Sequence, residues 1–267
     1  KPLKVESMDY SFILKFEQHL VETGVSVNGI AAYMRAVRAL LNKAVKLDLM
    51  DARTYPFKHY SIRTERTPSR AESIENLRRF YKMELEPTSE QHHARNTFFL
   101  IFGLIGISFM DLITLRKKDR RGDRIIYRRK KTGKIYSIRI TDFVQKLLDE
   151  YADSDSEFLL PQFGLDGIPE SKVRLHVNLR LKTTNKYLKK SGLELGLETT
   201  LTTYVARYSW ANIAKKLGFS KDLIAESLGH NYGNSVTGIY LDAYGDETID
   251  QANMIVLSSI MTETTER

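Results

Sequence analysis

One strongly apolar stretch, between Ser89 and Ile107, constrains the fold of this chain more than any other segment. Its second half carries large apolar side chains at almost every position, namely Phe98, Phe99, Leu100, Ile101, Phe102 and Leu104. A helix of this composition is apolar on all sides, so it has to be enclosed by other elements. It is also interrupted by glycines and too short to span a membrane. The segment is therefore expected to be a buried helix.

The rest of the chain is predicted to be mainly helical, with one small β-hairpin and two domains. Residues 53–70 contain two prolines and no helical period, which is typical of an interdomain linker. Asn28 can cap one helix, and Ser69-Arg70-Ala71-Glu72 is typical of a capping box opening another. The hairpin is expected over residues 124–140, with its turn at Thr132-Gly133. Apolar periodicity predicts the helices over residues 8–23, 29–47, 89–107, 141–151, 172–190 and 246–261.

The composition favours a polyanionic partner. Lys and Arg number 41 and Asp and Glu 33, so the formal net charge is +8 and the pI is about 9.4. Such a balance fits nucleic acid but is shared by proteins that bind none. Cysteine is absent, which excludes disulfides and thiolate metal sites and fits a reducing compartment. There is no apolar run of membrane-spanning length and no signal peptide, so a cytoplasmic location and no membrane partner are expected.

Two of the predicted helices have a basic face that could lie along DNA phosphates. A solvated helix face is the alternative for both. The residues concerned are Arg35, Arg38, Lys43 and Lys46 in the helix over 29–47, and Arg180 and Lys186 in the helix over 172–190.

Between Leu201 and Gly245 the chain offers three groups that phosphodiester attack requires. Arg207 lies early in a helix, His230 directly follows a helix end at Leu228-Gly229, and Tyr240 comes ten residues later. A guanidinium matches two phosphate oxygens, an imidazole can carry a proton near neutral pH, and a phenol can act as a nucleophile. A satisfied structural histidine is the alternative for His230.

These boxes resemble the tyrosine recombinase (phage integrase) family. The matching pieces are Ala206-Arg207-Tyr208-Ser209-Trp210-Ala211, Leu228-Gly229-His230 and Thr237-Gly238-Ile239-Tyr240, and the resemblance covers nearly the whole chain. The Thr-x-x-Tyr frame favours Tyr240 as nucleophile over its rivals Tyr232 and Tyr244. The closest similarity is to integrases of Bacteroides-type conjugative transposons, which usually carry a further arm-DNA-binding domain. Because the chain starts at Lys1, that domain is expected to have been trimmed away.

The resemblance implies both an architecture and an activity. Residues 1–66 would form a helical, SAM-like core-DNA-binding domain, and residues 67–267 the catalytic domain. The implied protein is a site-specific DNA recombinase, or integrase, of a mobile genetic element, which cleaves and rejoins double-stranded DNA through a 3′-phosphotyrosyl intermediate. It would need no metal, ATP or other cofactor, because positioned cations stabilise charge and the covalent link keeps the bond energy. A homotetramer on DNA and an accessory DNA-bending protein are further expectations.

The resemblance also implies roles for individual residues, and at two positions the chain differs from the family pattern. A lysine at the hairpin turn, Lys131 with Lys130 and Lys134 as fallbacks, would protonate the leaving 5′-oxygen. Ser108 stands where most members have a phosphate-gripping arginine. We expect it to be a helix N-cap paired with Asp111. The cations that could replace the missing arginine are Arg95, Arg116, Arg128 and Arg129, and the sequence does not choose among them.

Tyr204 is the second departure, because it stands where the family has a histidine. A phenol can donate a hydrogen bond to a phosphate oxygen but is no base near pH 7. The alternative for Tyr204 is a buried amphipathic side chain.

Three alternatives stay open. The two departures allow a DNA-binding protein that has kept the fold and lost or weakened its cleavage activity. A metal-dependent transposase is less favoured, since no carboxylate set has convincing spacing, and a type IB topoisomerase shares the chemistry. The C-terminal helix would pack on the next subunit in the family, or alternatively fold back on its own domain.

Overall fold

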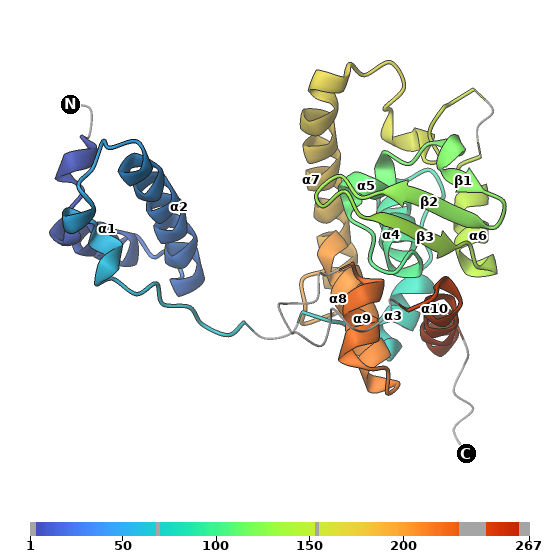
Figure 1. Ribbon diagram of the computed structural model, residues 1–267. Helices are drawn as coiled ribbons and strands as arrows, with labels where there is room; N and C mark the ends of the chain where they lie inside the picture. The colour runs from blue at the N-terminus through green and yellow to red at the C-terminus, as the bar shows by residue number, and fades with distance from the viewer. Residues whose placement is uncertain (1–3, 68–69, 153–154, 230–243, 262–267) are drawn as a thin grey trace. The chain divides into compact units, whose positions relative to one another are not determined.

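The computed structural model describes residues 4–67, 70–152, 155–229 and 244–261 (Figure 1). The chain divides into two compact units, Lys1–Pro68 and Ser69–Arg267. Both are mostly helical, and the second also holds a small antiparallel sheet, as the sequence predicts.

The first unit is built on two helices. Its elements are η1 (Val5–Ser7), α1 (Tyr10–Glu22), α2 (Val27–Lys46), η2 (Ala52–Thr54) and η3 (Pro56–Lys58). Ile13 and Met34, fully buried between α1 and α2, anchor its core. The segment predicted as a linker from residue 53 onward is partly wrong, because Phe57 and Tyr60 pack against this core. Their aromatic surface is better buried than exposed, which draws the start of the segment into the unit.

The predicted cap of α2 is also wrong. Ser26, not Asn28, caps the helix, because its backbone is extended and its hydroxyl accepts from the N–H of Gly29 at 3.3 Å. Asn28 clamps the backbone of Glu65 instead: its Nδ2 donates to the carbonyl at 2.9 Å, and its Oδ1 accepts from the N–H at 3.1 Å. The side chain thus ties the end of the unit back to α2.

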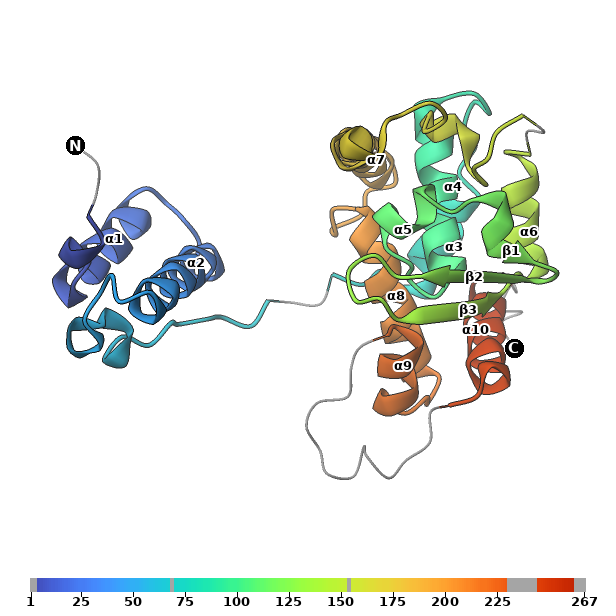
Figure 2. The ribbon, with the colours of Figure 1, turned by 45° about the horizontal axis from the view of Figure 1, so that its top comes forward.

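The second unit surrounds one buried helix. Its first helices are α3 (Ile74–Tyr81), α4 (Glu90–Gly103) and α5 (Phe109–Ile113), and its later ones are α6 (Asp142–Asp149), α7 (Glu170–Glu194), α8 (Thr203–Lys216), α9 (Lys221–Ser227) and α10 (Asp246–Met261). Residues 98–102 of α4 are at most 1% exposed. The helix is in contact with α3, α6, α7 and α8, as Figures 1 and 2 let the reader follow. The predicted buried helix is therefore confirmed, but it ends at Gly103 and not at Ile107, because Ile105 and Gly106 have positive φ.

The start of this unit differs from the prediction. Helix α3 begins at Ile74, capped by Ser73, and not at a capping box formed by residues 69–72. Glu72 is buried, and its N–H donates to Ser209 Oγ of α8 at 2.9 Å. Because this hydrogen bond holds the backbone of Glu72 against α8, helix α3 begins only after it.

The sheet has three antiparallel strands in the order β1-β2-β3. They are β1 (Arg120–Arg121), β2 (Arg124–Arg128) and β3 (Ile135–Arg139), with η4 (Lys117–Asp119) before β1 and η5 (Pro161–Phe163) after α6. The predicted hairpin is β2-β3, in register with Tyr127 opposite Tyr136. The two-residue strand β1 has no periodicity of its own and is missed by the sequence.

Helix α10 folds onto its own unit. Val256 is fully buried there, and Asn253 links two other helices: it accepts from Trp210 Nε1 at 2.8 Å and donates to the carbonyl of Gly103 at 2.9 Å. Asp250 binds the guanidinium of Arg124 in β2 at 2.6 Å. These contacts bury Ala252, Val256 and Leu257 within the unit, whereas Ile255 of the predicted apolar stripe stays 42% exposed.

Candidate active site

Arg207 lies at the centre of the candidate site. It comes from α8, is 8% exposed, and bridges two carbonyls: Nη1 donates to Gly106 at 2.5 Å and Nη2 to Leu228 at 2.6 Å. Gly106 permits this approach, because its φ is +67° and a Cβ there would lie 2.6 Å from Arg207 Cγ. Burial lowers the pKa of Arg207, and the positive charge of Arg129 lowers it further. The site therefore concentrates positive charge in a largely dry setting, which suits a phosphate.

Gly229 ends α9 in the left-handed conformation predicted from the sequence, with φ +66°. The preceding carbonyl, that of Leu228, is the one that Arg207 binds. His230 and Tyr240, the predicted proton carrier and nucleophile, lie outside the described residues, as does the rival Tyr232.

Tyr244, the other rival nucleophile, is described and turns toward α9. Its hydroxyl lies 3.3 Å from Ser220 Oγ, and its backbone N–H donates to Glu226 Oε2 at 3.2 Å.

Of the four arginines considered as replacements for the missing one, Arg129 lies beside Arg207. Its Nη1 is 3.4 Å from Tyr136 Oη and 3.5 Å from the carbonyl of Gly229. Arg116 is paired with Glu157 instead.

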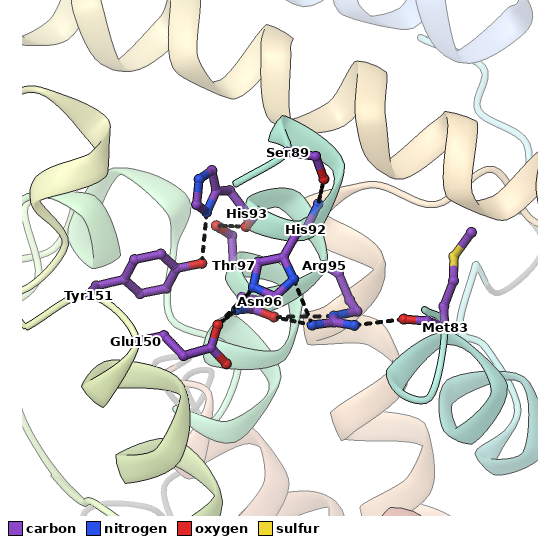
Figure 3. A network of polar contacts seen from close by, with 9 residues as sticks. All are labelled: Met83, Ser89, His92, His93, Arg95, Asn96, Thr97, Glu150 and Tyr151. Carbon is purple, nitrogen blue, oxygen red and sulfur yellow. Dashed lines mark hydrogen bonds and ion pairs between the residues drawn. The ribbon is translucent and has the colours of Figure 1, made fainter. Parts of the chain in front are cut away.

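The other two candidate arginines are also occupied elsewhere. Arg128 donates to the carbonyl of Gly133 at 2.6 Å within the hairpin turn. Arg95 belongs to the polar network of Figure 3, where it donates to the carbonyl of Met83 at 2.7 Å and contacts His92 and Asn96.

That network holds α4 against the end of α6 through hydrogen bonds. Glu150 accepts from His92 Nε2 and from Asn96 Nδ2, both at 2.7 Å. Beside it, His93 Nδ1 lies 3.2 Å from the hydroxyl of Tyr151. Burial lowers the pKa of His93, and the neighbouring His92 lowers it further.

Ser108 is the N-cap of α5, as predicted: its Oγ accepts from the N–H of Asp111 at 3.1 Å. The same hydroxyl donates to Asp111 Oδ2 at 2.6 Å, while Asp111 Oδ1 accepts from the backbone N–H of Lys130 at 3.0 Å. Asp111 is 4% exposed. The serine at the departed arginine position thus orients a buried carboxylate that holds the hairpin, a role for Asp111 that the Ser-x-x-Asp pattern only hinted at.

The hairpin turn places Lys131 at the surface. The turn closes through the Gly133 N–H, which donates to the carbonyl of Arg129 at 2.8 Å, and Gly133 has φ +71°. A pocket of about 600 Å³ lies beside it, lined by Ser108, Asp111, Arg129, Lys130, Lys131 and Arg174 among others. Lys131 and Arg129 therefore line the same pocket.

Tyr204 is exposed rather than buried, which overturns the alternative considered for it. It is 57% exposed, one turn before Arg207 on α8, and its ring meets Tyr208 edge-on with centroids 4.8 Å apart. Its hydroxyl is thus accessible to a ligand.

The predicted DNA-binding residues divide into two groups. Arg180 points into the protein and not along an exposed basic face: it is partly buried, its Nη2 donates to the carbonyl of Gln162 at 2.5 Å, and its guanidinium lies over Phe163. Packing of α7 against η5 turns it inward. The remaining predicted residues, Arg35, Arg38, Lys43, Lys46 and Lys186, are all exposed.

None of the helices within the described residues is both long and apolar enough to cross a membrane. No group of three or more His, Cys, Asp or Glu within the described ranges could hold a metal ion.

Comparison with known proteins points to one family. Residues 1–62 match the phage integrase SAM-like domain, and residues 74–247 match the phage integrase family. No curated protein sequence matches the chain.

Two solved structures illustrate the similarity of fold. The Tn1549 transposon integrase, in complex with transposon right end DNA, is 17% identical, with a TM-score of 0.60 over 97% of this chain and 87% of that one. A lambda integrase dimer bound to a COC' core site is 13% identical, with a TM-score of 0.57 over 94% of this chain and 82% of that one.

Proposed function

The chain belongs to the phage integrase family and is a site-specific tyrosine recombinase, and we propose that Arg207, Lys131, His230 and Tyr240 carry its chemistry. The observation that carries this proposal is the position of Arg207. It is buried against the carbonyl of Leu228, two residues before His230, with Arg129 beside it. This arrangement provides for a phosphate the planar donor fork that lysine cannot copy.

The proposed first step is attack of the Tyr240 phenolic oxygen on the scissile phosphate. A bond forms between that oxygen and phosphorus, and the bond from phosphorus to the 5′-oxygen breaks. His230 takes up the phenolic proton, and Lys131 donates a proton to the departing 5′-oxygen. The product is a 3′-phosphotyrosyl link, and a 5′-hydroxyl of a neighbouring strand reverses the step.

We assign the place of the missing arginine to Arg129. It is the member of the candidate set that lies beside Arg207, and it lines the same pocket as Ser108 and Lys131. Two guanidiniums then face the phosphate, with the exposed phenol of Tyr204 as a further donor. Positioned cations of this kind stabilise a pentacoordinate phosphorus without a metal, and the covalent link removes the need for ATP.

The proposed partner is double-stranded DNA. The Tn1549 and lambda integrases that this chain resembles in fold were both solved with DNA. We propose that residues 1–66 clamp the duplex through the exposed cations of α2, and that residues 67–267 cut it. A cytoplasmic homotetramer on DNA, assisted by a DNA-bending protein, and membership of the Bacteroides-type conjugative-transposon subgroup complete the proposal.

The test is a covalent trap. The protein is mixed with a nicked duplex that loses a short fragment after cleavage, and adducts are separated on a denaturing gel. The duplexes are drawn from a library containing the ends of the element that encodes the chain. We expect an adduct with the wild type and none with Tyr240→Phe, whereas Tyr244→Phe and Tyr232→Phe serve as matched controls that retain it.

DNA binding without any adduct would point instead to a protein that has lost cleavage. Binding itself should weaken steeply with salt, because phosphate contacts release counterions. An affinity that does not change between about 50 and 200 mM salt would contradict the basic clamp.

A further inference from the structure

A tyrosine on the hairpin, Tyr136, reaches the end of α9. It comes from β3, and its hydroxyl lies 3.4 Å from the carbonyl oxygen of Leu228, to which it donates. Arg129 Nη1 donates to the same hydroxyl at 3.4 Å. Arg207 also binds the Leu228 carbonyl, at 2.6 Å. Side chains from two elements, Tyr136 of β3 and Arg207 of α8, thus donate to the same oxygen.

The ring of Tyr136 is pressed against Gly229. A Cβ built on Gly229 would lie 1.1 Å from Tyr136 Oη and 2.2 Å from its Cζ. The tip of the phenol therefore occupies the volume that any side chain at this position would need. Together with φ +66°, this restricts the position to glycine for two independent reasons.

Tyr136 is itself held in place by its neighbour across the sheet. Its ring stacks on Tyr127, with centroids 5.2 Å apart and an interplanar angle of 18°, and Tyr127 is 8% exposed. The ring is thus a fixed support rather than a flexible surface group, and stacking of this kind adds stability beyond burial.

We propose that Tyr136 is a positioning residue for the cleavage reaction: its ring backs the Leu228-Gly229 turn and so fixes the carbonyl to which the Arg207 guanidinium donates. This inference rests on the proposed function. Reacting groups displaced by about 1 Å can lose a hundredfold in rate, so a turn without its support should lower the rate of cleavage while leaving DNA affinity intact.

The test compares Tyr136→Ala with Tyr136→Phe in the full chain. Single-turnover formation of the covalent adduct should fall by about tenfold to a hundredfold in the alanine variant. It should stay within about threefold of wild type in the phenylalanine variant, because the ring remains and the lost hydrogen bonds are long. The Kd for the uncleaved duplex should be unchanged in both. Tyr187→Ala, at a half-buried tyrosine of α7, is the matched control.

A second comparison separates positioning from general loss of structure. Gly229→Ala should abolish cleavage in the wild type but have a smaller further effect in a Tyr136→Ala background, since the clash with the ring is then gone and only the strain of the positive φ remains. A duplex with sulfur at the bridging 5′ position, whose leaving thiol needs no proton, should not rescue Tyr136→Ala.

Three results would overturn the inference: cleavage by Tyr136→Ala at the wild-type rate, loss in the phenylalanine variant as large as in alanine, or additive effects of the two substitutions. Absence of an adduct with the wild type would instead refute the proposed function itself.

Discussion

Replacing Asp111 with alanine should both destabilise the second unit and slow cleavage. The carboxylate accepts from Ser108 Oγ at 2.6 Å and from the N–H of Lys130 at 3.0 Å, and the residue is 4% exposed. It is the link between α5 and the turn that carries Lys131. Asparagine keeps one neutral acceptor for Lys130, so its effect should be smaller.

The magnitude follows from these contacts. Hydrogen bonds to a charged group each contribute about 1.5–3 kcal/mol, giving an upper bound of about 3–6 kcal/mol for the pair. Part of this is offset by the cost of burying the carboxylate. We therefore expect Asp111→Ala to lose about 2–4 kcal/mol of unfolding free energy, and Asp111→Asn about 1–1.5 kcal/mol.

The stability assay uses the single tryptophan of the chain. Trp210 is fully buried in the second unit, so its fluorescence during urea unfolding reports on that unit. Asp123→Ala removes an exposed carboxylate in the turn between β1 and β2, which pairs with Arg139 at the surface. It is the matched control and should shift the midpoint very little.

The kinetic assay asks whether Asp111 acts through Lys131. Misplacing the lysine should slow adduct formation by about a hundredfold, and a bridging 5′-sulfur should restore most of that rate because its leaving group needs no proton. Lys131→Ala should be rescued in the same way. Two results would contradict this: normal cleavage by Asp111→Ala, or rescue by sulfur of Lys131→Ala but not of Asp111→Ala. In either case the hydrogen bond between Asp111 and Lys130 does not position Lys131 for proton donation.

Three further predictions follow from the same structure. Arg207→Lys should slow cleavage by about 10²–10³-fold, because an ammonium cannot bridge two carbonyls and still present two parallel donors to a phosphate. Arg116→Lys, at an exposed ion pair, should leave the rate unchanged. Equal cleavage rates in the two variants would contradict this role of Arg207. Burial lowers the pKa of His93 below its ordinary value of about 6.5, so the unfolded chain binds more protons and stability should fall as pH drops below that value. His93→Gln should flatten this dependence in urea titrations at pH 5, 6 and 7, and an unchanged slope would contradict it. Asp250→Asn should cost about 3 kcal/mol by the tryptophan assay, because it breaks a largely buried ion pair with Arg124. A loss below about 1 kcal/mol would mean that this ion pair contributes little to holding α10 in place.

Local rules predict much of the fold. The apolar stretch that becomes α4 has to be buried whatever surrounds it, and the cap at Ser108 acts within one helical turn. Gly229 ends α9 for an equally local reason, since glycine tolerates a positive φ. Two predicted caps were wrong because the residues bind partners far along the chain: the Asn28 side chain binds the backbone of Glu65, and the Glu72 backbone N–H binds Ser209.

Motifs and periodicity are readable over a few residues, so the sequence was enough to indicate the family and most of the helices. Which of the four candidate arginines lies beside Arg207 depends on packing, and it is visible in the folded protein alone. The sequence does not distinguish Arg95 from Arg129. In the folded protein Arg95 binds the carbonyl of Met83, whereas Arg129 contacts the carbonyl of Gly229, a hundred positions away along the chain. The contact of Tyr136 with the same glycine is likewise a product of packing. Such convergence depends on how elements are arranged against one another, which no local pattern encodes.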